Sequence, residues 1–219
     1  MRTTLNIHGL WFALAMLNLQ CITPASQMHE ISINNSNNHQ EENKSLLFIG
    51  NSLTYTHNLP SLVQEVGRRQ GLELEVNMIT KPNYALIDHW KEKEVQRLIN
   101  SKKYNYVIIQ QGPSSQLAGR RMLIEDGKKY TDLCAKNGCQ VAYFMVWPSW
   151  QNAESFEKVI LNHEDAAAQN GAILCPVGRE WKNYIDKTKD LSYYGADRFH
   201  PSLKGSKVAA NIIYHSLFE

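Results

Sequence analysis

Short apolar runs alternate with longer amphipathic segments through most of the chain, and this alternation is the feature that most limits the fold. Most of the runs are apolar at nearly every position, as strands buried on both faces of a sheet are. The strands expected from the pattern are 45–50, 72–80, 104–112, 139–147 and 172–178. Helical periodicity predicts helices over 58–71, 85–103, 122–138, 155–171 and 202–219.

Helices between continuously apolar strands predict a parallel sheet that is covered on both faces. With right-handed crossovers, this order gives an α/β fold of doubly wound type, a three-layer αβα sandwich with about five parallel strands. In such a sheet, ligands bind beyond the carboxyl ends of the strands. Ser52, the segment after Gln111, and Trp147 are therefore expected to gather at one edge of the sheet.

The charge and the spacing of possible metal ligands exclude several classes of function. A formal net charge of +2 over 219 residues is too small to indicate a nucleic-acid partner. Beyond the N-terminal region no run of apolar residues is long enough to predict a membrane span. The Cys and His spacing matches no zinc site, and neither a metal nor an organic cofactor is expected.

The first 25 residues have the features of a secretory signal peptide. Arg2 is followed by the apolar run 10–17, and small residues lie at 23–25. Export to the periplasm, the cell surface or the medium is therefore expected, with a buried N-terminal helix as the alternative. A lipid anchor at Cys21 stays open, although residues 18–20 lack the small side chains typical of such a site.

Residues 26–44 are polar and rich in asparagine, which predicts a disordered linker before a single domain over 45–219. Outside the leader, the cysteines are Cys134, Cys139 and Cys175. An odd number is unusual for an exported chain. Cys134 and Cys139 could form a disulfide, but a bridge between a helix end and a strand start depends on geometry that the sequence does not fix.

Ser52 follows the first expected strand directly, in the stretch LLFIGNSLTYTHNLP. Its hydroxyl is therefore expected at the edge of the sheet, beside a helix N-terminus that favours developing negative charge. A serine nucleophile needs a base. Asp197 and His200, three residues apart near the other end of the chain, supply a carboxylate and an imidazole. His200 would take the proton of Ser52, and Asp197 would orient the ring.

Each of these residues also has an ordinary structural explanation. A serine after a strand is often a helix cap, an aspartate often stabilises a turn, and a histidine before a proline is often a surface residue. The combination of nucleophile, base and orienting carboxylate favours catalysis over these alternatives.

Gly50-Asn51-Ser52-Leu53, together with Asp197-x-x-His200, resembles the GDSL/SGNH hydrolase family, whose first block is Gly-Asp-Ser-Leu and whose last is Asp-x-x-His. The resemblance covers residues 45–218 and implies a flavodoxin-like parallel sheet and a serine ester hydrolase. Asn51 replaces an aspartate of the family pattern that is not itself part of the triad.

The resemblance also implies residues that would bind the oxyanion. The family's second block has a glycine, but the stretch KPNYALIDHW has none, and Asn83 is nearest to its place. The third block is replaced by Gln111-Gly112, which resembles the branch of sialate and xylan acetylesterases, where a glutamine amide donates to the oxyanion. Gln111 is the expected donor, with Gln110 and Ser114 as alternates. A strand-end amide that satisfies the backbone is the other explanation of Gln111.

Several further residues lie near the expected site. His57 and His89 are expected to support it or to lie on helix faces rather than to act in catalysis. Aromatic residues in strand-end loops could stack on sugar rings or pack in the core. These residues are Trp147, Trp150, Tyr193 and Tyr194.

The resulting hypothesis is an exported serine esterase that removes a small acyl group, such as acetyl, from a carbohydrate through an acyl-enzyme. Its expected partner is a small-molecule or polysaccharide ester, and the sequence sets no oligomeric state. Two alternatives stay open. A lipid or phospholipid acyl hydrolase would have a wide apolar groove at Ser52, and a non-catalytic carbohydrate-binding protein would share the fold but leave the serine inert.

Overall fold

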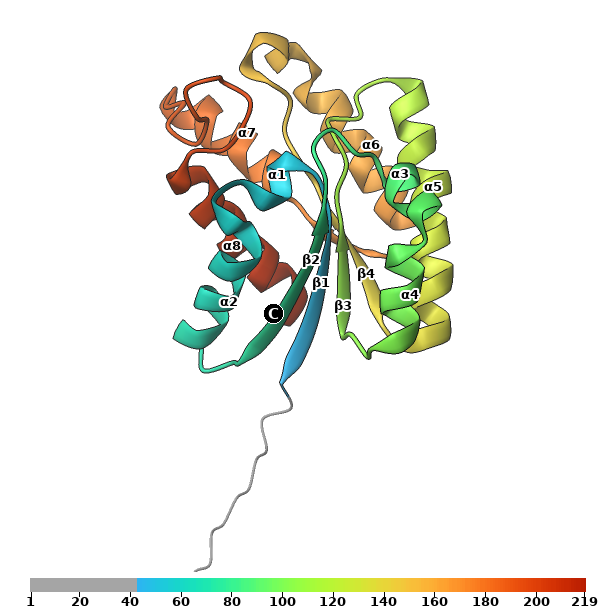
Figure 1. The fold of residues 1–219 in the computed structure, drawn as a ribbon. Coiled ribbons are helices and arrows are strands. Elements are labelled where there is room, and N and C mark those ends of the chain that lie inside the picture. Colours follow the sequence, from blue (N-terminus) through green and yellow to red (C-terminus); the bar gives the residue numbers. More distant parts are fainter. Residues whose placement is uncertain (1–42) are drawn as a thin grey trace, which may run out of the picture. The chain divides into compact units, whose positions relative to one another are not determined.

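Five strands form one parallel sheet in the order β2-β1-β3-β4-β5 (Figure 1). The computed structural model describes residues 43–219. The predicted signal peptide, Cys21 and all of the predicted linker before residue 43 lie outside the described residues. The strands are β1 (Lys44–Gly50), β2 (Leu74–Thr80), β3 (Tyr106–Ile109), β4 (Gln140–Phe144) and β5 (Ile173–Cys175). The predicted α/β fold with about five parallel strands is confirmed.

Helices cover both faces of the sheet, as the three-layer prediction requires. The α-helices are α1 (Ser52–Tyr55), α2 (Leu59–Arg69), α3 (Leu86–Glu92), α4 (Glu94–Ser101), α5 (Leu117–Asn137), α6 (Phe156–Gln169), α7 (Val177–Thr188) and α8 (Leu203–Phe218). Two 3₁₀ segments are η1 (Thr56–Asn58) and η2 (Trp150–Ser155). Figure 1 shows α2 and α8 on one side of the sheet and α3, α4 and α5 on the other.

Side chains of β1 fill both layers of core, which explains why this strand is apolar throughout. Leu46 and Phe48 pack with α2 and α8, whereas Leu47 and Ile49 pack with α3, α4 and α5. All four are fully buried. Burial stabilises the fold by about 1.5–3 kcal/mol for each such side chain, so this inner strand has little freedom to shift its register.

The prediction of one helix over 85–103 is wrong, because the segment forms two helices. Lys93 has a φ of 64°, a left-handed conformation that ends α3 before α4 begins. The linker prediction extends one residue too far, since β1 begins at Lys44. The helix expected from residue 122 begins at Leu117.

Helix α7 was not predicted, and its first residues were assigned to a strand over 172–178. Strand β5 ends at Cys175, and Val177, Trp181 and Ile185 form the buried face of the helix that follows. Their spacing of four residues is the helical signal that the sequence contains.

Three of the four aromatic residues considered for sugar stacking are part of the core. Trp147 is fully buried and stacks on Trp181, with ring centroids 3.5 Å apart. Tyr193 and Tyr194 are buried against the same indole of Trp181. Trp150 is 38% exposed.

Cys134, Cys139 and Cys175 are buried free thiols. Cys139 follows the end of α5 so closely that its backbone N–H donates to the Cys134 carbonyl, at 3.0 Å. Among residues 43–219, no helix has the length and apolarity to cross a membrane. Within the same part of the chain, no group of three or more His, Cys, Asp or Glu side chains is placed to hold a metal ion.

His163 makes the stability of this core sensitive to acid. It lies on α6, is 1% exposed, and donates from Nδ1 to the Val159 carbonyl at 2.8 Å. Burial lowers the pKa of His163 to about 4 from an ordinary value of 6.5. The unfolded chain therefore binds a proton more readily than the folded chain between these two values, and stability must fall as the pH falls through this window.

We predict that acidification from pH 7 to pH 4 lowers the free energy of unfolding by about 3 kcal/mol through His163 alone. Urea unfolding at several pH values measures this loss. In a His163→Leu variant the dependence of the unfolding free energy on pH should be weaker by that amount. Equal slopes in His163→Leu and wild type would contradict the prediction.

Candidate active site

The turn between β1 and α1 presents Ser52 at the carboxyl edge of the sheet. Asn51 caps the helix: its side-chain oxygen accepts from the Leu53 N–H at 3.2 Å. Its carbonyl accepts from the N–H groups of Thr54, at 2.9 Å, and Tyr55, at 3.1 Å. Within residues 43–219, the Ser52 N–H is the one amide of α1 that these bonds leave without an acceptor. The turn therefore offers a free backbone donor beside the Ser52 hydroxyl.

Gln110 closes this turn from the neighbouring strand. Its side-chain oxygen accepts from the Asn51 N–H at 2.9 Å and from the Thr54 hydroxyl at 2.8 Å. A Cβ at position 50 would lie 2.4 Å from that oxygen, so Gly50 is required for the close approach. Gln110, an alternate oxyanion donor in the sequence prediction, is buried beneath the turn and does not line the cavity at Ser52.

Asn51 also connects the turn to the segment after β2. Its amide nitrogen donates to the Tyr84 carbonyl at 3.1 Å. An aspartate has no N–H to make this bond. An asparagine at position 51 therefore has a local physical reason.

Ser52, His200 and Asp197 are connected in series by hydrogen bonds. The Ser52 hydroxyl lies 2.8 Å from His200 Nε2, across 148 positions of sequence. His200 Nδ1 lies 2.6 Å from the Asp197 carboxylate. The other oxygen of Asp197 accepts from the N–H groups of Phe199, at 3.0 Å, and His200, at 2.9 Å. The bond from His200, helped by these amides, holds the pKa of Asp197 below its ordinary value.

The loop that carries Asp197 and His200 is fixed through its backbone. The Gly195 N–H donates to the His200 carbonyl at 2.7 Å and closes the loop on itself. Three other carbonyls of the loop accept from separate elements. The Trp150 N–H donates to the Arg198 carbonyl at 2.8 Å, and Trp147 Nε1–H donates to the Phe199 carbonyl at 3.0 Å. His57 Nε2–H donates to the Pro201 carbonyl at 3.2 Å.

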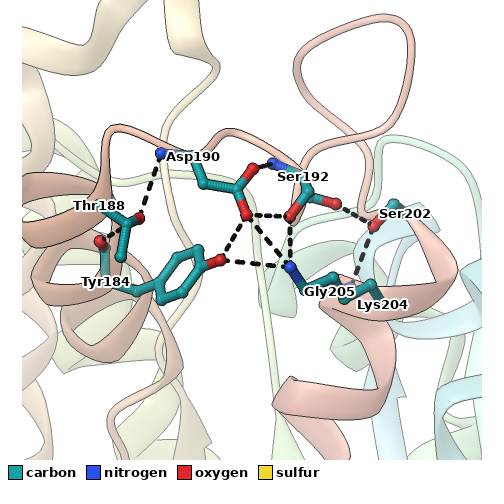
Figure 2. Close-up of polar contacts among 7 residues, drawn as sticks. All are labelled: Tyr184, Thr188, Asp190, Ser192, Ser202, Lys204 and Gly205. Carbon is teal, nitrogen blue, oxygen red and sulfur yellow. Dashed lines mark hydrogen bonds and ion pairs between the residues drawn. The ribbon is translucent and has the colours of Figure 1, made fainter.

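A polar network ties the chain before this loop to the helix after it (Figure 2). The Asp190 carboxylate accepts from the Tyr184 hydroxyl, from Ser192, and from Lys204 Nζ at 3.1 Å. The Ser202 hydroxyl donates to the Ser192 carbonyl at 2.6 Å. The bonds from Ser192 are the main reason that the pKa of Asp190 lies well below its ordinary value. Both ends of the loop are thereby held at the start of α8.

Ser52 opens into a cavity of about 450 Å³, which we call the Ser52 cavity. Of the residues predicted to bind the oxyanion, the structure brings Asn83, Gln111 and Ser114 to this cavity. The full lining is Asn51, Ser52, Asn83, Tyr84, Ala85, Gln111, Gly112, Pro113, Ser114, Ser115, Gln116, Gly119, Met122 and Phe199.

The hydrogen bonds within the cavity wall show which side chains still have an N–H or O–H group free to donate to a ligand. Gln111 donates one N–H to the Ser114 hydroxyl at 2.9 Å, and that hydroxyl donates to the Gly112 carbonyl at 3.0 Å. The single hydrogen of Ser114 is therefore used, whereas Gln111 retains a second N–H. Asn83 has a φ of 62°, in a turn after Pro82. Asparagine adopts this left-handed conformation more readily than most residues.

The histidines near the site support the backbone, as the sequence analysis expected. His89 is buried and donates from Nε2 to the Gly50 carbonyl at 2.8 Å, and burial lowers its pKa. Tyr84, Met122 and Phe199 also line the cavity, and none of them is among the predicted site residues. Of the three, Phe199 could have been predicted, because it lies between Asp197 and His200 in the sequence.

Comparison with known proteins gives structural matches only. No protein-family model and no curated protein matches the sequence. A candidate SGNH hydrolase from Slackia heliotrinireducens superposes with a TM-score of 0.65 at 20% identity, over 80% of this chain and 98% of that one. A lipase/acylhydrolase from Enterococcus faecalis gives 0.64 at 16% identity, over 78% and 94%. The acetyl xylan esterase AlAXEase gives 0.63 at 16%, over 78% and 98%. At these identities the matches show that the chain has the fold of these hydrolases.

We predict that Gln110→Leu lowers the free energy of unfolding by about 2 kcal/mol, because the buried Asn51 N–H loses its acceptor. Thr54→Val is the matched control: it removes one donor and leaves the Asn51 bond intact, so it should cost only about 1 kcal/mol. Urea unfolding of both variants measures the difference. A larger cost for Thr54→Val would show that Gln110 does not hold the turn through Asn51.

Proposed function

We propose that the chain is a serine ester hydrolase of the SGNH type that removes small acyl groups, such as acetyl, from carbohydrate. The observation that carries the proposal is the series of hydrogen bonds from Asp197 through His200 to Ser52, at 2.6 and 2.8 Å, beside a cavity. A serine whose only role is to cap a helix does not need an imidazole that is hydrogen-bonded to its hydroxyl and oriented by a carboxylate.

In the proposed reaction, Ser52 Oγ attacks the ester carbonyl while His200 Nε2 takes its proton. Asp197 keeps Nδ1 protonated and stabilises the imidazolium that forms. The low pKa of Asp197 supports this role, because the carboxylate stays anionic as the ring becomes charged. The oxyanion would accept from the Ser52 N–H, from a backbone N–H near Asn83, and from the second N–H of Gln111.

Collapse of the tetrahedral intermediate breaks the bond to the alcohol, which leaves with the proton from His200. An acyl group then remains on Ser52. A water molecule, deprotonated by the same imidazole, attacks this acyl-enzyme and releases the acid.

The lining of the Ser52 cavity is mixed. Seven of its residues carry an amide or an aliphatic hydroxyl, which supports a small ester on carbohydrate, and apolar surface comes from Tyr84, Ala85, Pro113, Met122 and Phe199. A lipid hydrolase was expected to have a wide apolar groove at Ser52. The fold is shared with an acetyl xylan esterase and also with a lipase/acylhydrolase, so the choice rests on the cavity. Export through the predicted signal peptide is part of the same proposal.

We predict that Ser52→Ala and His200→Ala each lower kcat for p-nitrophenyl acetate by at least about 10³-fold, because nucleophile and base act as a unit. His215→Ala, at an exposed position of α8, is the matched control and should retain full activity. A fluorophosphonate should add one adduct to the wild type, at Ser52. A binding protein with an inert serine would show no adduct and no hydrolysis.

We also predict that kcat/KM falls at least about tenfold from p-nitrophenyl acetate to the octanoate ester, because a long acyl chain would cover the amide and hydroxyl groups of the Ser52 cavity without offering them hydrogen-bond partners. A chain-length series on wild-type protein measures this. Preference for long chains would favour the lipid acyl hydrolase instead.

A further inference from the structure

A second cavity adjoins the Ser52 cavity at a wall that includes Phe199, the residue before His200. It has a volume of about 390 Å³, and because it is bordered by the segment that contains η2, we call it the η2 cavity. Its lining is Pro113, Ser115, Gln116, Pro148, Ser149, Asn152, Glu154, Ser155 and Phe199. Four of these residues, Pro113, Ser115, Gln116 and Phe199, line the Ser52 cavity as well. The two cavities thus share a wall.

Because the η2 cavity lies beside Phe199 and hence near His200, its position indicates which part of an ester it could hold, the acyl group or the alcohol. In acyl transfer the histidine delivers its proton to the leaving alcohol, so that alcohol must lie on the imidazole side of Ser52. Phe199 precedes His200 in the chain, and its ring centroid lies 5.1 Å from that of the imidazole. A wall formed by Phe199 therefore lies where the alcohol leaves.

The chemistry of the lining indicates what kind of alcohol fits. Hydroxyl, amide and carboxylate groups predominate, and they come from two loops, 113–116 after β3 and 148–155 after β4. Asn152 Nδ2 donates to the Ser149 hydroxyl at 2.9 Å, and the Ser155 hydroxyl donates to the Asn152 carbonyl at 2.8 Å. Among the hydrogen bonds of residues 43–219, the side-chain oxygen of Asn152 and the Glu154 carboxylate have no partner, so a polyhydroxylated alcohol could donate to them and an alkyl alcohol could not. Pro113, Pro148 and Phe199 supply apolar surface, a combination typical of small-molecule sites.

The charge of the lining indicates whether the alcohol bound in the η2 cavity is neutral or anionic. Glu154 is the one charged residue in the wall, and among the ion pairs of residues 43–219 none includes it. It is exposed, and no cation of the lining can neutralise an anionic ligand. A phosphate or a sugar carboxylate would meet repulsion from Glu154. Neutral hydroxyls, in contrast, can donate to its oxygens.

We propose that the η2 cavity is the alcohol subsite of this enzyme and that it takes a neutral, polyhydroxylated alcohol such as an uncharged sugar unit. The inference rests on the proposed function for the position of the ester at Ser52. It adds the location of the alcohol, the residues that select it, and the discrimination against acidic alcohols. Asn152 and Glu154 determine specificity in this subsite.

The test compares three acetyl esters that differ only in the alcohol: ethyl acetate, a mono-O-acetyl methyl xyloside, and a mono-O-acetyl methyl glucuronide. Wild-type protein should favour the xyloside over ethyl acetate by at least about tenfold in kcat/KM, and over the glucuronide likewise. Asn152→Ala and Glu154→Ala should each reduce the ratio of xyloside to ethyl acetate about threefold to tenfold. Glu154→Lys should shift the preference from the xyloside toward the glucuronide.

Gln151→Ala is the matched control, because Gln151 is an exposed neighbour within η2 that does not line the cavity. Its ratio should equal that of the wild type. A wild-type ratio near one, or equal ratios in Asn152→Ala, Glu154→Ala and wild type, would overturn the subsite while leaving the esterase proposal intact.

Failure of the proposed function has a different signature, which is that none of the three esters is hydrolysed in a manner dependent on Ser52. Binding to intact Ser52→Ala protein, measured by calorimetry with the acetyl xyloside, still tests the cavity in that case. Weaker binding after the further change Asn152→Ala supports the subsite. Binding that Asn152→Ala leaves unchanged, or no binding in either protein, refutes it.

Discussion

The hydrogen bonds to the Gln110 side-chain oxygen are the interaction on which the candidate site depends. They join the ends of β1 and β3, two neighbouring parallel strands, at the point where the chain must turn into α1. The turn has no regular backbone partner for the Asn51 N–H, and a buried N–H without an acceptor is costly. Gln110 supplies that acceptor, Gly50 makes room for it, and the direction of Ser52 follows from the two together.

The second half of the site requires that a distant loop be held as rigidly as this turn. Ser52 and His200 belong to opposite ends of the domain, so their contact is maintained only if α8 and the loop before it are fixed. Helix α8 packs on α2, which itself follows Ser52 within a few residues. The Asp190 network then attaches the loop to the first turn of α8. Individually weak surface bonds act here in a network, where they order a segment better than isolated pairs do.

The sequence is informative about the sheet because buried parallel strands must be apolar throughout. It also predicts that Ser52, Asp197 and His200 lie together, because each is next to a recognisable element boundary, and the structure places them in contact. It is less informative where one residue decides the backbone. Lys93 in a left-handed conformation divides a segment whose periodicity is helical throughout. Gln110 and Gln111 show the same limit: successive strand residues face opposite sides, and only the packing of helices tells which side contains the site. Gln110 extends the face of Ile108, under α1 and α2, and Gln111 the face of Ile109.

One hydrogen bond connects the turn that carries Ser52 with the segment after β2. The segment after β2 lacks a glycine, and its Asn83 has a left-handed backbone conformation. A turn with a positive φ is less stable when the residue is not glycine, because a Cβ in this backbone conformation is sterically unfavourable. Asn51 donates to the carbonyl of Tyr84, the residue directly after Asn83, and thereby holds that turn against the turn that carries Ser52. An aspartate at position 51 could not do so. Asn51 and the left-handed turn at Asn83 are therefore parts of one arrangement, in which the Ser52 turn positions residues 83–85 in the wall of the cavity.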